Sequence, residues 1–238
     1  MIPVVVNADR QILLVLLALT FVTGIVDAVS YLGLGHVFTA NMTGNVVLLG
    51  FAVAGASGLS VARSSLSLLA FLAGAVCGGR LRLLMIRRPR HRWIVTAGML
   101  EATLLLGAAV VSIGLDITTE IPSRPAYAVI VLTAVAMGFR TVTVRQLAVL
   151  DLTTTVLTQM LAAVAGESSL AGGNNPRLGR RVAAVVLMFA GAAVGVLLLR
   201  HGLALPLAVS GVCVLAASLY EVVSTLRDSG RSGAEIQS

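Results

Sequence analysis

Long apolar runs, separated by short polar connections, recur along this chain and restrict the folds that are open to it. They cover residues 11–33, 38–57, 65–84, 93–115, 125–147, 152–166, 180–200 and 202–225. Several of them are close to the roughly 20 residues that an α-helix needs to cross a bilayer. Only 11% of the residues are charged, against roughly 25% in an average soluble domain. The chain is therefore predicted to be an all-α integral membrane protein.

The positions of arginine indicate how many of these runs cross the membrane. All 17 basic residues counted as Lys or Arg are Arg, and six of them lie between Arg80 and Arg92, in the connection between two runs. Because basic residues gather on the cytoplasmic side, this cluster would be misplaced if every run crossed from a cytoplasmic amino terminus. The cluster lies inside if the second and sixth runs dip in and return. We therefore predict six transmembrane helices with both termini cytoplasmic; eight crossings with both termini outside is the alternative.

The two halves of the chain repeat one another, since their apolar runs keep the same order. The aligned residues are Gly24 with Gly138 and, after a one-residue slip, Thr39 with Thr154 and Thr43 with Thr158. Three crossings per half is an odd number, so the second half would enter the membrane from the opposite face, as in many transporters. We expect a 3+3 inverted repeat, with two re-entrant or half-helix segments in addition to the crossings. The expected limits are residues 1–225 for a single transmembrane domain (repeat one 11–115, repeat two 125–225) and 226–238 for a disordered cytoplasmic tail.

Polar residues alternate in the segment from His36 to Leu49, HVFTANMTGNVVLL, where an apolar run begins. The preceding glycines would let the chain run extended toward the midplane, with a half-helix starting near Thr39 and capped by Thr39 or Asn41. The unpaired N–H groups of such a half-helix suit a small polar or anionic ligand. Helix packing and capping without a ligand is the alternative. The predicted contacts are Asp27, Tyr31, Thr39, Asn41, Thr43, Asn45, Thr154, Thr155 and Thr158.

Ionisable residues inside the predicted spans are few, and each is costly in lipid, so each is expected to face a partner or a pathway. At 1.5 Å per residue, Glu101 and Arg140 lie at similar depth, about 5 and about 6 Å inside the midplane, whereas Asp27 lies about 7 Å outside it. We predict a structural ion pair between Glu101 and Arg140. For Asp27 two interpretations stay open: coupling to a proton or cation, or a carboxylate that caps the half-helix.

Other function classes receive no support from the sequence. The motifs Gly-x-Ser-x-Gly, the Walker loop and His-Glu-x-x-His are absent, so an enzyme is not expected. Cys77 and Cys213 lie inside apolar runs, and His36 has no partner at metal-ligand spacing, so no metal or other cofactor is expected. The net charge of +7 is explained by the topology signal rather than by nucleic acid. Membrane lipid, a small solute and a coupling proton are the predicted partners, and the oligomeric state stays open.

Two motifs carry a resemblance to a known family. The residues G-x-x-D-A-x-x-Y-L from Gly24 to Leu32 and F-T-A-N-M-T-G-N from Phe38 to Asn45 resemble the YoaK-type family of uncharacterised bacterial multi-span membrane proteins (domain of unknown function 1275). The second half keeps the threonine-rich stretch from Asp151 to Thr158, but Gly138, Phe139, Arg140 and Thr141 stand where the family has Gly-x-Gln-Asn. The resemblance implies a multi-pass protein of the bacterial inner membrane.

The inverted repeat and the broken helices predict a small-solute transporter. Its site would lie between the repeats, at the starts of the two half-helices. A carrier is favoured over an aquaporin-like pore, since the chain lacks Asn-Pro-Ala. The alternative function is a non-transporting membrane scaffold or partner-binding protein.

Overall fold

The computed structural model describes residues 3–115, 124–146 and 157–235, with side chains described over 12–115, 124–146 and 157–224. The regular secondary structure of these residues consists of helices, with turns and loops between them. The helices are α1 (Pro3–Gly33), α2 (Met42–Val53), α3 (Val61–Leu84), α4 (Arg90–Val111), α5 (Arg124–Gln146), α6 (Leu157–Gly166), α7 (Leu178–Leu199) and α8 (Ala204–Glu235), with a 3-10 turn η1 (Ser169–Ala171) between α6 and α7.

Within the described residues, six helices are long and apolar enough to cross a membrane, which confirms the predicted number of transmembrane helices. They are Ile12–Gly33 of α1, α3, α4, α5, α7 and Ala204–Ser224 of α8. The apolar helices α2 and α6 contain only 12 and 10 residues. At 1.5 Å per residue they extend about 18 and about 15 Å, well short of a hydrocarbon core of about 30 Å. These short helices correspond to the two predicted half-helix segments.

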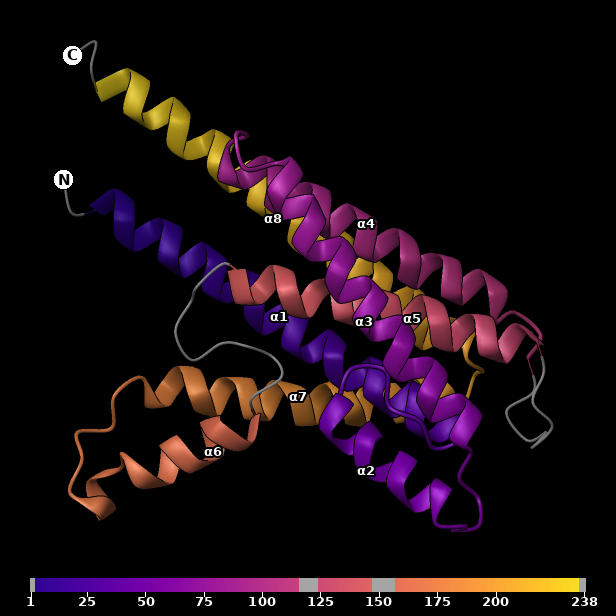
Figure 1. Ribbon diagram of the computed structural model, residues 1–238. Helices are drawn as coiled ribbons and strands as arrows, with labels where there is room; N and C mark the ends of the chain where they lie inside the picture. Colours follow the sequence, from indigo (N-terminus) through magenta and orange to yellow (C-terminus); the bar gives the residue numbers. More distant parts are fainter. Residues whose placement is uncertain (1–2, 116–123, 147–156, 236–238) are drawn as a thin grey trace.

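The direction of each helix follows from its place in the chain. In Figure 1, α1, α4 and α7 run one way along the bundle and α3, α5 and α8 run the other way, so that the start of α1 and the end of α8 lie at the same end. The short helices α2 and α6 begin near the middle of the bundle and run toward opposite ends. They lie beside the bundle, α2 against α3 and α6 against α7.

Glycine allows two pairs of long helices to approach closely. Gly24 of α1 and Gly191 of α7 face each other's helix, as do Gly138 of α5 and Gly74 of α3. A Cβ atom at any of these four positions would lie 2.0–2.3 Å from a backbone carbonyl oxygen of the facing helix. Small residues at such contacts are a common means of helix association in membranes. The same kind of contact therefore joins α1 to α7 and α3 to α5.

The connection from α1 to α2 differs from the predicted extended segment. The His36 N–H donates to the Tyr31 carbonyl at 3.0 Å, and Gly35 has a φ of +83°. This is the pattern of a Schellman cap, in which a glycine with positive φ ends a helix. His36 also has positive φ, at 58°. The glycines of this segment permit an extended chain, but glycine also permits the positive φ that this turn requires. The structure contains the turn.

The end of α8 also differs from the expectation. A disordered tail was predicted from residue 226, but α8 continues as a helix to Glu235. Serine, glycine and charged residues are poor signals for a helix when considered alone. Extending an existing helix, however, fixes one residue for each hydrogen bond gained, which is easier than starting a new helix.

Candidate functional site

The buried carboxylate of Asp27 holds the start of α2. Its side chain projects from α1, and its Oδ1 atom accepts hydrogen bonds from the backbone N–H groups of Ala40 at 3.2 Å and Asn41 at 3.3 Å. Asp27 is only 8% exposed. These contacts are those of a carboxylate that caps the segment leading into the half-helix, because the two N–H groups precede the first residue of α2. Coupling of Asp27 to a proton or cation stays a prediction.

Two asparagines of the motif bond to the backbone. Asn41 is the N-cap of α2: its Oδ1 accepts from the Gly44 N–H at 3.2 Å. Asn45 is 1% exposed, and its Nδ2 donates to the Ser64 carbonyl of α3 at 3.0 Å. The Oδ1 atom of Asn45 accepts from the Phe38 N–H at 3.4 Å. Asn45 thereby joins the segment before α2 to α3.

Thr39, just before α2, has a buried side-chain hydroxyl without a hydrogen-bond partner in the part of the chain that the structure describes. The residue is fully buried, and its Oγ1 finds no hydrogen-bond partner among the described residues. Leaving a buried polar group unpaired costs about 1–3 kcal/mol. We name the polar residues around this point the α2-start cluster: Asp27, Thr39, Asn41, Asn45 and Ser67, the last of which donates to the Phe38 carbonyl at 2.6 Å.

A second buried polar contact joins three of the crossing helices. Arg140 of α5 is 2% exposed and Glu101 of α4 is 4% exposed. The Nε and Nη2 atoms of Arg140 both donate to Oε1 of Glu101, the Nε bond at 2.6 Å. Its Nη1 atom donates to the Leu19 carbonyl and to Thr23 Oγ1 of α1, both at 2.9 Å. The two residues predicted as an ion pair are therefore in contact. Thr23, which Arg140 also contacts, lies one helical turn before Asp27 on α1.

The remaining predicted contacts are placed differently. The Tyr31 ring is half-buried and stacks on Phe38, with ring centroids 5.0 Å apart. Thr43 and Thr158 are exposed, so the structure does not place them with the buried residues of the α2-start cluster. Thr154 and Thr155 lie outside the described residues.

Sequence reasoning missed Ser64 and Ser67 of α3, which bond the motif. For Ser67 the signal in the sequence was a small polar residue near the start of the third apolar run, whereas Ser64 contributes only its main-chain carbonyl, for which the sequence has no signal. Over the described residues, no group of three or more His, Cys, Asp or Glu side chains lies together in a way that could hold a metal ion.

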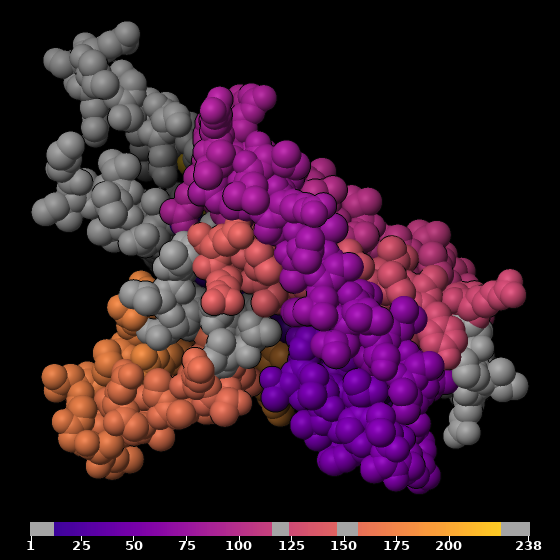
Figure 2. Space-filling view, viewed as in Figure 1, coloured from indigo at the N-terminus to yellow at the C-terminus, as the bar shows by residue number. Residues whose placement is uncertain are grey.

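The two short helices lie on one face of the molecule. Figure 2 shows this face, and its surface recedes between α2 and α6. The apolar side chains exposed on α2 include Val46, Val47 and Phe51. In a membrane protein such exposure is expected, because lipid tails are as apolar as these side chains.

Six candidate spans, two short apolar helices and a buried polar network define the class: a multi-pass α-helical membrane protein. Residues 15–220 match the family model described as "Protein of unknown function (DUF1275)", and the chain belongs to this family. The chain is also 37% identical over 166 residues, or 68% of either chain, to the UPF0700 transmembrane protein YoaK of Bacillus subtilis (strain 168). No solved structure matches the chain.

Proposed function

We propose that this protein is a carrier for a small polar or anionic solute in the bacterial inner membrane, with both termini cytoplasmic. The observation that carries the proposal is the placement of α2 and α6, which begin near the middle of the bundle and run toward opposite ends. Helices broken at the middle of the bilayer form the binding sites of many transporters, since their N-terminal N–H groups point at the substrate.

An inverted repeat of α1–α4 and α5–α8 is part of this proposal. The close contact of α1 with α7 has its counterpart in the contact of α5 with α3, and each contact uses one glycine from each helix. Gly24 and Gly138 would be equivalent in the two repeats, as would Gly74 and Gly191. The opposite directions of α1 and α5 support the inversion.

The solute would bind at the start of α2. The Thr39 hydroxyl is buried and unpaired among the described residues, so a solute that hydrogen-bonds to it would remove the cost of its burial. The N-cap Asn41 and Thr43 of the first turn of α2 would contribute to binding. Thr154, Thr155 and Thr158 would contribute from the equivalent part of the second repeat.

Asp27 would link proton binding to the position of α2. The Asp27 carboxyl group accepts two backbone hydrogen bonds from the residues just before this helix. Hydrogen bonds to a charged acceptor are stronger than those to a neutral one. Protonation of Asp27 would therefore weaken its hold on the start of α2, which would make α2 the moving element of the transport cycle.

The test is solute uptake into liposomes that contain the purified protein, with solutes chosen by their effect on its thermal unfolding temperature. Thr39→Val removes the unpaired hydroxyl at nearly constant volume. The matched control is Thr103→Val, since Thr103 is exposed on α4 and its hydroxyl bonds within that helix, to the Met99 carbonyl.

We expect Thr39→Val to lower uptake about tenfold or more without lowering the unfolding temperature, because the loss of one hydrogen bond to a solute is worth about 1.4 kcal/mol or more. Thr103→Val should transport normally. If no solute of the panel is moved and none changes the unfolding temperature, the carrier proposal is wrong and a membrane scaffold becomes the better description.

A further inference from the structure

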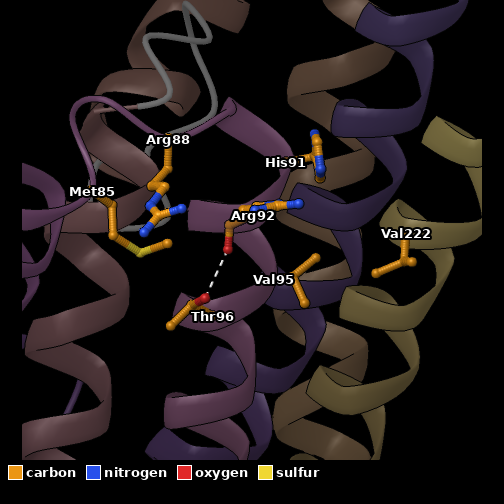
Figure 3. A pocket seen from close by; sticks show the side chains of 7 residues that line it. All are labelled: Met85, Arg88, His91, Arg92, Val95, Thr96 and Val222. Carbon is orange, nitrogen blue, oxygen red and sulfur yellow. Dashed lines mark hydrogen bonds between the residues drawn. The ribbon is translucent and has the colours of Figure 1, made fainter. Parts of the chain in front are cut away.

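A pocket of about 510 Å³ opens where the connection between α3 and α4 meets α8. Its volume is within the roughly 300–1,000 Å³ range of small-ligand sites. Figure 3 shows the side chains that line it: Met85 and Arg88 from the connection, residues of the first two turns of α4, and Val222 of α8. It is remote in sequence from every residue of the α2-start cluster.

The lining combines positive charge with apolar surface. Arg88, His91 and Arg92 supply the basic groups, and Met85, Val95 and Val222 supply the apolar ones. The Thr96 hydroxyl, also in the lining, donates to the Arg92 carbonyl at 2.8 Å. Among the described residues, neither Arg88 nor Arg92 makes an ion pair. Both guanidinium groups are exposed and available to an anion.

The position of the pocket matches the level of lipid headgroups. The candidate span of α3 ends at Leu84, that of α4 begins at Arg90, and that of α8 ends at Ser224. The pocket residues therefore lie where three spans leave the hydrocarbon, within the polar layer of a bilayer. Phosphate groups of phospholipids occupy this layer, and guanidinium groups match their geometry by bidentate hydrogen bonds.

Apolar side chains continue from the pocket toward the middle of the membrane. Met99 follows Val95 by one turn of α4, and Leu219 precedes Val222 by about one turn of α8, so each lies on the same side of its helix as the pocket residue. Both Met99 and Leu219 are exposed. A molecule with an anionic head and acyl chains would match the charge of the pocket and the apolar surface below it.

We propose that this pocket binds the headgroup of an anionic phospholipid through Arg88, His91 and Arg92. A soluble phosphate would use the same guanidinium groups but would leave the apolar lining unused. The lipid is therefore the assigned ligand. This inference does not depend on the proposed transport function.

The single tryptophan of the chain provides a local probe. Trp93 follows Arg92 on α4, is 1% exposed and lies under the Arg82 guanidinium, 4.9 Å from the ring centroid. The full-length protein would be placed in two kinds of phosphatidylcholine bilayer. One contains phosphatidylglycerol with brominated acyl chains, and the other contains the same amount of phosphatidylcholine with brominated acyl chains. Bromine quenches tryptophan fluorescence at short range, so the difference between the two lipids measures the preference of the pocket for the anionic one.

Two matched double variants separate the pocket from general attraction to a basic surface. Arg88→Gln with Arg92→Gln removes two charges from the pocket, whereas Arg80→Gln with Arg87→Gln removes two charges from the same cluster outside the pocket lining. We expect the Arg88→Gln, Arg92→Gln variant to lower the preference for phosphatidylglycerol about tenfold, because it loses the attraction of two basic groups to an anionic lipid. The Arg80→Gln, Arg87→Gln variant should retain most of the preference.

Val222→Phe reduces the pocket volume without changing the charge, and it should also lower the preference. This variant keeps the test decisive if the arginine variant does not fold. The proposal is overturned if wild type shows no preference, or if both double variants lose it equally. It is also overturned if millimolar inorganic phosphate relieves the quenching by phosphatidylglycerol, since the pocket would then be a soluble-phosphate site.

Discussion

Arg140 of α5 donates two hydrogen bonds to a single carboxylate oxygen of Glu101, and its third nitrogen reaches across to α1. The guanidinium thus joins three crossing helices at one point inside the bundle. Since both charged groups are buried, each is costly without the other. Substitutions of Glu101 and Arg140 are therefore expected to have coupled effects on the free energy of unfolding.

Glu101→Gln alone and Arg140→Gln alone should each lower the free energy of unfolding by about 3–5 kcal/mol, because each leaves a buried charge without its counter-charge. The double variant should cost less than the sum of the two. Thermal or denaturant unfolding of the purified protein gives the three values. An additive result would show that the two side chains are not coupled in the folded state.

Asn45→Ala should destabilise the protein by about 2–3 kcal/mol, since it removes two hydrogen bonds and leaves the part-buried Phe38 N–H without its side-chain partner. The comparison is Asn41→Ala, which removes an exposed N-cap and should cost about 1 kcal/mol. Both are measured by unfolding under the same conditions. Equal losses would mean that the contact of Asn45 with α3 contributes little.

Gly191→Ala should lower the unfolding temperature, because the added Cβ would lie 2.0 Å from the Phe21 carbonyl oxygen of α1. Gly107→Ala is the control. It lies on α4, where an added methyl group would meet no described atom within 4 Å, and the substitution should be stabilising by about 0.5–1 kcal/mol through helix propensity. A harmless Gly191→Ala would indicate that α1 and α7 can separate without loss.

The proposed orientation predicts where the α3–α4 connection lies. After replacement of Cys77 and Cys213 by serine, an Arg87→Cys variant should react with a membrane-impermeant thiol reagent only after the cells are opened. Arg87 is exposed in this connection, so access within the protein does not limit the reaction. Labelling of intact cells would place the basic cluster outside and reverse the proposed topology.

The sequence predicted most of the crossing helices, because their length and arginine distribution follow from the thickness and charge asymmetry of a membrane. It also placed Glu101 and Arg140 at one depth, since the rise per residue of a helix is constant. It could not predict that Arg140 would reach the Leu19 carbonyl and the Thr23 hydroxyl. A backbone acceptor leaves no mark on the sequence, and a threonine inside an apolar run is usually bonded within its own helix.

The candidate site was predicted less completely. Asn41 was one of the two expected caps, and it is the N-cap of α2. Thr43 belongs to the same alternating pattern, yet it is exposed, because residues two apart in a helix point to different sides. Alternation places all of the polar residues on one face only while the chain is extended, and the start of the helix changes which of them share a face.

The reach of Arg140 to α1 has a consequence for how this family can diverge. Its bond to the Leu19 carbonyl places no demand on the side chain at position 19, which can vary among apolar residues at little cost. Positions 101 and 140 must change together. Relatives that carry Gln where this chain has Arg140 are therefore expected to lack an acidic residue at the position of Glu101, and an alignment of the family would show the two exchanging as a pair.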